Sequence, residues 1–366
     1  MRTRRDALLL SIVCLAVCVP QCTGQGVGKR VFTDMEGRNV TVPEKITRVL
    51  GMSPVATILI YTLAPDRLAG WNYKQDLGEA EMVPEPYRSL PVLGGWYGKN
   101  NTGNLEEIAK ARPDVLISMG DPLGMSAAER ISEQTHIPVI LLNGDLKSLP
   151  AAYLKAGELL YQPERARELA EVCRKAINEV EQKVNTIPLS KRRRVYYAEG
   201  PTGLETEPSN SMHSEALVFA GALNVAAVPN QQGYGHTPVS MEQVLVWDPE
   251  FVITGYDHTT SPSVFYAGVW KNRGWQQVRA VKTHNVYEVP QYPFCWIDRP
   301  PSVNRIIGIK WLANLFYPDI FRYDIREEAR KFYATFYHFK LTDSQLTKLL
   351  ATSIHSGQKA ESWQGR

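Results

Sequence analysis

The chain is poor in cysteine. It has five among 366 residues, and three of these lie within the first 24 residues. The other two, Cys173 and Cys295, lack the close spacing of metal-binding or redox pairs, which excludes a cysteine-based centre. A disulfide between them and two isolated buried thiols both fit the sequence. The helical surroundings of Cys173 favour the thiols.

Motifs of catalysis are absent too. The sequence has no glycine-rich nucleotide loop, no H-E-x-x-H and no G-x-S-x-G. Its 41 basic and 38 acidic residues nearly balance, and no basic patch indicates binding to nucleic acid. We therefore expect no catalytic residues, no cofactor and no nucleic-acid partner.

No apolar run is long enough to span a bilayer comfortably. The longest, residues 7–19, follows three arginines and ends at Pro20, which is typical of a secretory signal peptide. We predict cleavage after residue 24 and export of the mature chain. Cys18 and Cys22 both lie in poor contexts for lipid attachment, so a lipid-anchored form is the less favoured alternative.

A duplicated pattern is the most informative feature of the sequence. Residues 104–118 recur, class by class, at residues 240–254, and each copy reads as a helix followed by a buried strand. Asn104 and Ser240 are suited to cap the two helices, and a proline followed by an acidic residue ends each one. The pattern predicts two equivalent helix–strand units.

A second correspondence precedes each copy. Residues 47–70 and 193–226 both read as strand, loop, helix and turn, and such successive units predict parallel sheets with right-handed crossovers. We predict an α/β fold of two Rossmann-like lobes with a ligand cleft between them. Residues 151–184 read as an almost uninterrupted helix joining the lobes, with Pro163 at an early break or a new start. The predicted organisation is a signal peptide (1–24), an N-terminal lobe (25–150), a connecting helix (151–187), a C-terminal lobe (188–345) and a C-terminal tail (346–366).

The mature chain opens on the pattern D-x-x-G-R-x-V-x-V-P at residues 34–43. Together with the duplicated segments and the connecting helix, it makes residues 30–340 resemble the helical-backbone class of periplasmic binding proteins of ABC importers. That class serves the uptake of ferric siderophores, haem, cobalamin and some metals or oxyanions. The resemblance implies a periplasmic monomer that hands its ligand to a membrane permease with a cytoplasmic ATPase.

Within this class, the ligand differs between branches. Residues 298–305 and 311–318 look similar to a branch that binds iron or metal chelates, so a ferric siderophore or similar iron complex is the expected ligand. Residues 71–75 and 224–227 look similar to members that bind molybdate, tungstate or nickel chelates, which is the alternative. A ligand sensor or an exported metal-handling enzyme on the same scaffold stays open as a further alternative.

Ligand contacts are expected in the loops that follow the strands, because ligands of open α/β sheets lie beyond the carboxyl ends of the strands. The predicted ligand contacts are Ser53, Asn72, Tyr73, Trp96, Tyr97, His213, Tyr234, His236, Tyr256, Trp296 and Arg299, and the same loops carry Asp121, Glu199, Thr206, His258 and Asp298. The loops at residues 94–98 and 233–236 place large rings between glycines. That composition suits either a flat ligand platform or a turn with partly buried aromatics.

Three of these candidates, His213, His236 and His258, are histidines. Imidazole is a good ligand for nickel, zinc, copper or iron, but their spacing matches no local metal motif. Coordination of a metal, hydrogen bonding to a chelate and structural roles all remain open. Arg299 is suited to grip a carboxylate or oxyanion with two hydrogen bonds, whereas for Asp298 the sequence favours a cap of the following helix.

Glu106 and Glu242 hold equivalent places in the first turns of the two duplicated helices. A negative charge there stabilises a helix start. The resemblance also implies that each lobe presents one such glutamate to an arginine pocket on the permease. Both roles can hold at once.

Overall fold

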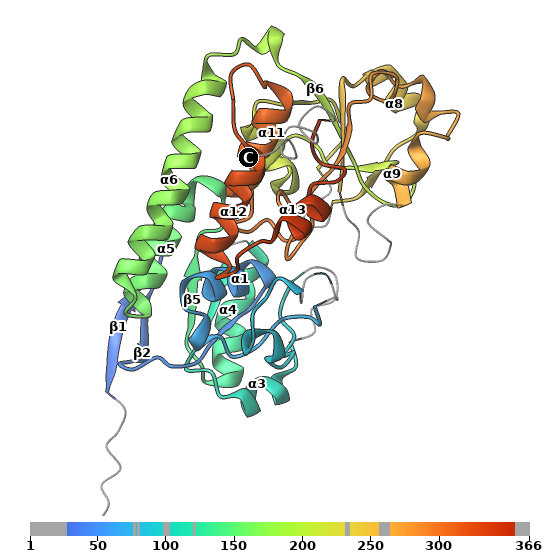
Figure 1. The fold of residues 1–366 in the computed structure, drawn as a ribbon. Helices are drawn as coiled ribbons and strands as arrows, with labels where there is room; N and C mark the ends of the chain where they lie inside the picture. Colours follow the sequence, from blue (N-terminus) through green and yellow to red (C-terminus); the bar gives the residue numbers. More distant parts are fainter. Residues whose placement is uncertain are drawn as a thin grey trace, which may run out of the picture.

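The computed structural model describes residues 28–75, 78, 81–97, 103–119, 122–230, 235–255 and 264–355. The predicted signal peptide and the candidates Asp121, Tyr234, Tyr256 and His258 lie outside this part of the chain. The described residues form two α/β lobes beside one long helix (Figure 1). None of the helices among them is long and apolar enough to cross a membrane.

The first lobe is built on the parallel sheet β3–β4–β5. An antiparallel hairpin, β1–β2, precedes it. The elements are β1 (Lys29–Thr33), β2 (Asn39–Pro43), β3 (Val49–Gly51), α1 (Pro54–Leu63), α3 (Leu105–Ala111), β4 (Val115–Met119), α4 (Pro122–Thr135) and β5 (Val139–Leu142).

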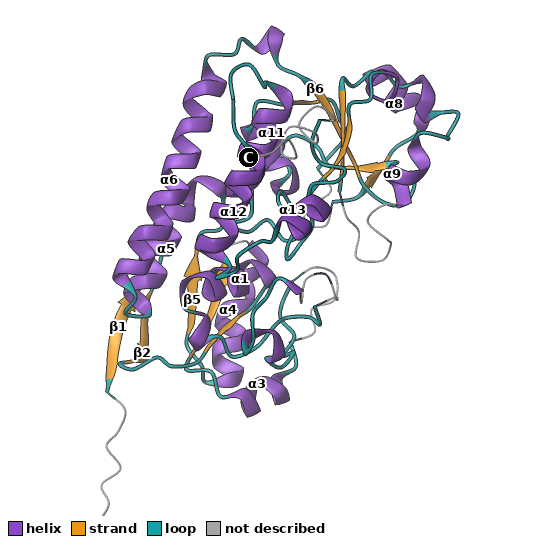
Figure 2. Cartoon of the chain, in the orientation of Figure 1, coloured by secondary structure: helices purple, strands orange, loops and turns teal. Residues whose placement is uncertain are grey.

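The second lobe is built on a parallel sheet of order β11–β10–β6–β8, with a short antiparallel pair, β7–β9, beside it. The elements are β6 (Arg194–Ala198), β7 (Glu205–Thr206), α7 (Glu215–Phe219), β8 (Leu223–Asn224), β9 (Thr237–Pro238), α8 (Met241–Trp247), β10 (Phe251–Thr254), α9 (Val264–Val269), α10 (Arg279–Lys282) and β11 (Val286–Glu288). Figure 2 shows that the two sheets lie apart, each with helices around it. The predicted α/β fold with two parallel sheets is confirmed.

Five helices lie between and beside the sheets: α5 (Leu149–Leu159), α6 (Pro163–Asn185), α11 (Arg305–Phe316), α12 (Ile325–Phe336) and α13 (Asp343–Leu349). The 23-residue α6 runs along both lobes and is about 35 Å long at 1.5 Å per residue. The connecting segment is not one continuous helix, because the chain turns at Tyr161, whose φ is 51°. Pro163 then starts α6, which was the second of its two predicted roles.

The duplicated units match down to single hydrogen bonds. Asn104 caps α3 by accepting the N–H groups of Glu106 and Glu107, and Ser240 caps α8 by accepting that of Gln243. The acidic residue after each proline then fixes the start of the neighbouring strand. The carboxylate of Asp114 accepts the N–H of Arg48 at 2.9 Å, and that of Glu250 accepts the N–H of Arg194 at 3.1 Å.

The opening pattern has a structural reason. Asp34 is buried, and its carboxylate accepts the N–H groups of Glu36, Arg38 and Leu141. Gly37 turns the hairpin at a φ of 76°, where residues with a Cβ are strained. The guanidinium of Arg38 pairs with Asp34 and donates to the carbonyl of Val139. The pattern therefore ties the hairpin to β5.

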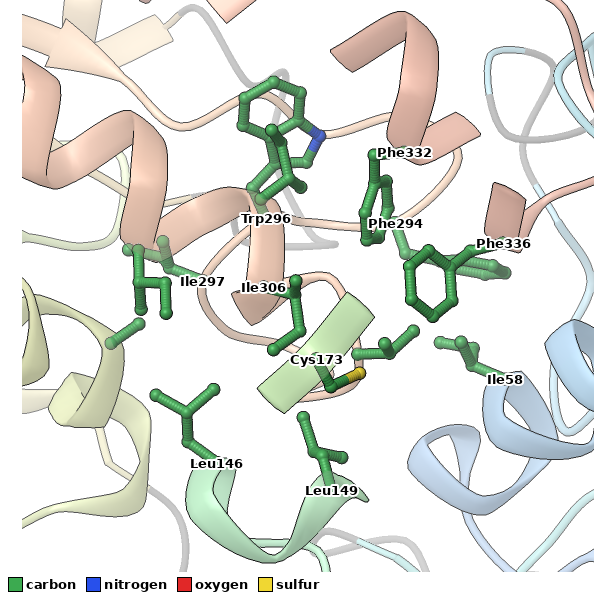
Figure 3. Close-up of a cluster of buried hydrophobic side chains, with 14 of the residues drawn as sticks. Ile58, Leu146, Leu149, Cys173, Phe294, Trp296, Ile297, Ile306, Phe332 and Phe336 are labelled. Atoms are coloured by element: carbon green, nitrogen blue, oxygen red, sulfur yellow. The ribbon is translucent and has the colours of Figure 1, made fainter. Parts of the chain in front are cut away.

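Side chains alternate along the strands between two cores. In β6, Val195 and Tyr197 enter a large core that also holds residues of α1, α6, α11 and α12, while Tyr196 and Ala198 enter a smaller core on the other face. The first-lobe sheet divides in the same way, with the odd residues of β4 in the large core and Leu116 in another small one. Figure 3 shows the large core around Cys173. One core is thus shared by both lobes.

Both remaining cysteines are buried free thiols, as their sequence context favoured. The chain from residue 346 to 355, assigned above to the C-terminal tail, is packed. The indole N–H of Trp311 donates to the carbonyl of Ser353 at 2.6 Å, and His355 Nδ1 lies 2.6 Å from the hydroxyl of Tyr287.

Candidate functional site

Arg299 lies at the centre of a buried network of charges in the second lobe. Its Nε donates to Glu199 Oε1 at 2.9 Å, and its Nη2 donates to Glu207 Oε1 at 2.6 Å. A third carboxylate, that of Asp298, lies 3.4 Å from Nε. Within the described residues, Nη1 of Arg299 forms no hydrogen bond.

The fold brings these residues together at one end of the sheet. Glu199 directly follows β6, Glu207 directly follows β7, and Asp298 and Arg299 lie in the loop before α11. The hydroxyl of Ser211 holds the second oxygen of Glu207 at 2.8 Å. The network therefore lies beyond the carboxyl end of a parallel strand, where open α/β sheets bind ligands.

Two histidines extend the network toward the surface. His213 Nδ1 lies 2.5 Å from Asp298 Oδ1, and His236 Nδ1 lies 2.7 Å from Glu205 Oε2. An ionised carboxylate only accepts, so each Nδ1 is the donor. The backbone N–H of His236 donates to the same Glu207 oxygen that holds Arg299. Each ring thus has its Nδ1 anchored, and neither Nε2 has a hydrogen bond within the described part of the chain.

The pairs shift the affinities of these groups for protons. Burial alone would lower the pKa of His213, but the charge and hydrogen bond of Asp298 raise it above its ordinary value. Burial would raise the pKa of Asp298, and His213 and Arg299 instead lower it. Burial opposes the charge of Arg299, yet Asp298 and Glu199 raise the pKa of the guanidinium. The ion pairs are therefore mutually stabilised.

Glu199 behaves differently. Burial, opposed in part by Arg299, raises its pKa to about 8, and the charges of Asp298 and Glu207 add to the increase. It therefore holds a proton at neutral pH. Arg299 and His213 lie against the carboxylates of Asp298 and Glu207. The second oxygen of Glu199, Oε2, is buried without a hydrogen-bond partner in the described residues.

The network has two layers. The side chains of Glu199, Glu207 and Asp298 are 2%, 1% and 0% exposed, whereas those of Arg299, His213 and His236 are 16%, 13% and 26% exposed. Three buried carboxylates therefore lie beneath Arg299 and His213, whereas Glu205, the partner of His236, is 38% exposed. A ligand arriving at this surface meets N–H donors or imidazole lone pairs whose orientation is already fixed.

The first-lobe candidates have internal partners. The buried amide of Asn72 accepts from Thr57 at 2.6 Å and donates to the carbonyls of Gly51 and Gly94 at 2.8 and 2.9 Å. These bonds leave little of the amide for a ligand, so Asn72 has a structural role. Ser53 caps α1, with its side chain accepting the N–H of Ala56 at 3.5 Å.

The aromatic candidates divide between surface and core. Tyr73, Trp96 and Tyr97 are half-buried, and the Tyr97 hydroxyl donates to the carbonyl of Asn72 at 3.3 Å. Trp296 is fully buried in the large core, where its indole N–H donates to the Tyr333 hydroxyl at 3.1 Å (Figure 3). The placement of Trp296 corrects the prediction that it faces a ligand.

The two lobes meet close to these loops. The rings of Trp71 and Phe294 lie 6.1 Å apart, which brings the segment before Tyr73 beside the loop that carries Trp296 and Arg299. Two hollows of about 310 and 420 Å³ are lined by other residues, and neither includes a member of the Arg299 network.

A metal held by side chains alone is not supported by the described residues. Among them, no three His, Cys, Asp or Glu side chains are placed to hold a metal ion. His213 and His236 each have their Nδ1 bonded to a carboxylate, and Arg299 cannot coordinate a metal. The arrangement suits a ligand that brings its own oxygen atoms.

Two essential members of the network, Glu205 and Glu207, were not predicted from sequence. They flank Thr206 in a Glu-Thr-Glu-Pro run that reads as a loop. Thr206, a predicted member of the loops, is buried and pairs with Thr237 across β7 and β9. The alternation of acidic, β-branched and acidic residues in this run could have predicted a short, half-buried strand.

The two predicted docking glutamates are exposed on the duplicated helices. The side chain of Glu106 is 79% exposed and lies 3.2 Å from Lys110 Nζ. Glu242 is exposed at the start of α8, where hydrogen bonds from its own backbone N–H and from Ser240 lower its pKa.

Comparison with known proteins gives a consistent family. Residues 79–293 match the model of a family described as "Periplasmic binding protein". The chain is 26% identical to the molybdate-binding protein MolA of Haemophilus influenzae, over 90% of this chain and 96% of that protein. An ABC transporter solute-binding protein of Sulfurospirillum deleyianum has a solved structure that is 34% identical, with a TM-score of 0.81 over 88% of this chain and 99% of its own.

A periplasmic solute-binding protein of Veillonella parvula is 25% identical, with a TM-score of 0.72 over 89% of this chain and 98% of its own. These relatives are transport proteins rather than enzymes. This chain therefore belongs to the periplasmic binding protein family and has the role of a solute-binding protein of an ABC transporter.

Proposed function

We propose that this protein captures a small metal chelate, a ferric siderophore or a similar iron complex, outside the cytoplasmic membrane and delivers it to an ABC permease. One observation carries the proposal. Arg299 and His213 reach the surface, each held by a buried carboxylate, and His236 lies beside them with its Nδ1 bonded to the partly exposed carboxylate of Glu205. The three form a set of nitrogen donors fixed in advance, which reduces the entropy lost on binding.

The chemistry of this surface selects among ligands. Guanidinium and imidazole N–H groups pair with carboxylate and other anionic oxygens. Among the described residues, no three metal-binding side chains are grouped, which favours a metal that arrives already chelated over a bare metal ion.

Molybdate or tungstate is the second candidate. It is favoured by the similarity to the molybdate-binding MolA and by the donors themselves, which match the oxygens of a tetrahedral anion. A nickel chelate would use the same surface, with an imidazole Nε2 completing the metal's coordination. A sensor or an enzyme has no comparable support among the relatives.

The test uses purified mature protein and a panel of ferric siderophores, haem, cobalamin, nickel–histidine, molybdate and tungstate. A ligand at 100 times its Kd stabilises the folded state by about 2.7 kcal/mol, which thermal unfolding detects readily. We expect an iron chelate to raise Tm. A rise with molybdate or tungstate alone would replace the first candidate by the second. If no member of the panel raises Tm and elemental analysis finds no co-purifying metal, the proposal fails.

Variants separate the site from the rest of the surface. Arg299→Gln and His213→Gln should each remove the ligand-induced rise in Tm, because each deletes one outward donor. Arg322→Gln is the matched control, since the exposed Arg322 bonds to the backbone of Asp319, outside the network. The proposal also predicts that Glu106→Lys combined with Glu242→Lys spares ligand binding and reduces transport, since both side chains lie on exposed helix starts.

A further inference from the structure

The turn between α6 and β6 carries a run of basic residues. Residues 184–198 contain no acidic residue, and positions 191–194 read Lys-Arg-Arg-Arg. This turn is the uppermost part of the molecule in Figure 1. The helix before it differs, because Arg165, Arg174 and Lys183 of α6 each pair with a glutamate one turn away. The run therefore lacks the local acidic partners that the basic residues of α6 have.

The last residue of the run, Arg194, lies among balanced charges. Its backbone N–H donates to Glu250 at 3.1 Å, and its guanidinium donates to a backbone carbonyl of α8. Arg279 lies 3.2 Å from Asp248 and 3.6 Å from Glu250. Two basic and two acidic residues thus offset one another at the start of β6.

The other three basic residues have no such balance. Lys191, Arg192 and Arg193 form no ion pair within the part of the chain that the structure describes. Arg193 is nevertheless fixed, because its backbone N–H donates to the Tyr317 hydroxyl at 2.9 Å and its Nε to a carbonyl of α11 at 3.3 Å. Counting the exposed Asp319 against these three residues leaves a net charge of 3 − 1 = +2.

Exposed apolar side chains lie around these charges. Leu189, at the start of the turn, is 74% exposed. Leu223 is 44% exposed, and its N–H donates to the carbonyl of Arg193 at 2.7 Å. Ile320 is 40% exposed, and its N–H donates to the carbonyl of Tyr317, which itself contacts Arg193. Single exposed apolar residues are ordinary, whereas three around one cluster of charges indicate a surface that another body covers.

The basic tip is the set Leu189, Lys191, Arg192, Arg193, Leu223 and Ile320. We propose that it binds the surface of a membrane that contains anionic phospholipids. Ammonium and guanidinium groups pair with the headgroup phosphates, and the apolar side chains enter the boundary between headgroups and acyl chains. A free phosphate or a nucleic acid would engage the charges alone and leave the apolar side chains in water. The inference goes beyond the proposed function, because it requires neither the ligand nor the permease.

The basic tip lies away from the ligand surface. Arg194 begins β6 and Glu199 directly follows it, so five residues, or about 16 Å at 3.3 Å per residue, separate the two ends of the strand. A membrane at the tip therefore leaves the Arg299 network uncovered. Each basic residue near an anionic surface strengthens binding about fivefold, so three give about a hundredfold. Contact of this strength is reversible and holds the protein close to the membrane without anchoring it.

The experiment measures co-sedimentation of the purified mature protein with vesicles of phosphatidylcholine alone and of phosphatidylcholine mixed with phosphatidylglycerol. One variant combines Lys191→Gln with Arg192→Gln, and a second is Leu189→Ser. The matched control combines Lys340→Gln with Lys348→Gln, which removes two exposed charges elsewhere. Circular dichroism and Tm verify that each variant folds.

We expect the wild type to bind only the vesicles with phosphatidylglycerol, and added salt to release it because salt screens exposed charges. The double variant at the tip should bind about 25-fold more weakly, at about fivefold for each charge. Leu189→Ser should weaken binding about threefold, since less apolar surface leaves water. The control should bind like the wild type.

Four results would overturn the proposal. They are equal binding to both kinds of vesicle, no binding to either, an equal loss in the control, and release by inorganic phosphate at an ionic strength where chloride has no effect. The last result would make the tip a site for free phosphate. Dimerisation of the wild type that Leu189→Ser abolishes would also contradict it, because a second copy of this chain would then cover the tip. The ligand-induced rise in Tm tests the proposed function separately, and the tip variants should retain it.

Discussion

Arg305 and Glu215 form an ion pair that joins the two lobes. The guanidinium of Arg305 is 1% exposed and donates both to Glu215 and to the carbonyl of Gly144 at the end of the first lobe. The carboxylate of Glu215 also accepts the N–H of Leu146 at 3.1 Å. Glu215 begins α7, two residues after His213, so the contact between the lobes and the ligand surface share one short turn.

Glu215→Ala should therefore destabilise the protein strongly. It leaves the buried Arg305 without its counter-charge, and we expect a loss of about 3 kcal/mol in the free energy of unfolding. Urea denaturation measures it. Glu328→Ala is the matched control. Glu328 pairs with Lys310, which lies on the same helix as Arg305, α11, but is 16% exposed where Arg305 is 1% exposed, so the loss should be about 1 kcal/mol. If both variants lost the same free energy of unfolding, the Arg305–Glu215 pair would stabilise the protein no more than the Lys310–Glu328 pair does.

Gly235 has a backbone that only glycine adopts easily, with φ at 61°, and a Cβ there would collide with the carboxylate of Glu207 and lie 2.7 Å from Arg299 Nη2. Gly235→Ala should displace the carboxylate that anchors Arg299, lowering stability by roughly 1–3 kcal/mol and weakening ligand binding. Thermal unfolding with and without ligand measures both effects. Gly268→Ala in α9, where a Cβ meets nothing within 4 Å, should be neutral or stabilising. A Gly235→Ala protein with unchanged ligand binding would contradict the assigned role of Glu207.

Stability should fall as the pH rises from about 5 to about 8. The pKa of Glu199 is about 8 in the folded protein and near 4.5 when unfolded, so over this interval the folded state binds more protons. The stability that this group contributes is complete below its unfolded pKa and is lost as the pH passes the folded one. His213, whose pKa is also raised, acts in the same direction above its ordinary value of 6.5.

Glu199→Gln should remove most of this slope, because the amide resembles the protonated acid and still accepts a hydrogen bond from Arg299. Urea unfolding at several pH values between 5 and 8 measures the slope. Glu158→Gln, at an exposed pair with Lys155, should leave the slope unchanged. A wild-type protein whose stability does not decline over this interval would show that Glu199 is ionised in the folded state.

Trp296→Phe should lower stability by about 1–3 kcal/mol and leave ligand affinity unchanged, because the indole fills the shared core and bonds to Tyr333. Chemical denaturation and ligand titration give the two values. Trp96→Phe, at a half-buried ring in the predicted ligand loops, is the comparison. If Trp296→Phe lowered ligand affinity and left the free energy of unfolding unchanged, Trp296 would be a ligand contact.

Much of the fold follows from local patterns. The helix–strand units could be predicted because Asn104 and Ser240 cap their helices and a buried strand follows each one, all within fifteen residues. The turn at Tyr161 could not, since a residue with a Cβ adopts a positive φ only when the packing around it compensates.

The site divides in the same way. Arg299, His213 and His236 could be named because they follow predicted elements. Glu207 could not, because its burial depends on a contact with Arg299, which is 92 residues away in the sequence. The alternation of side chains along a strand does not predict which way a side chain in the following loop points. Asn72 and Trp296 were therefore assigned to the ligand, although Asn72 bonds to the backbone and Trp296 fills the core.

The large core has a consequence for how the molecule unfolds. Alternate residues of both sheets, Val115 and Val195 among them, enter it together with α6 and α11. Neither lobe can then lose its packing without exposing apolar surface of the other. Calorimetry should record a single cooperative transition rather than two, and the isolated N-terminal half should not fold on its own. The two lobes therefore form one thermodynamic unit.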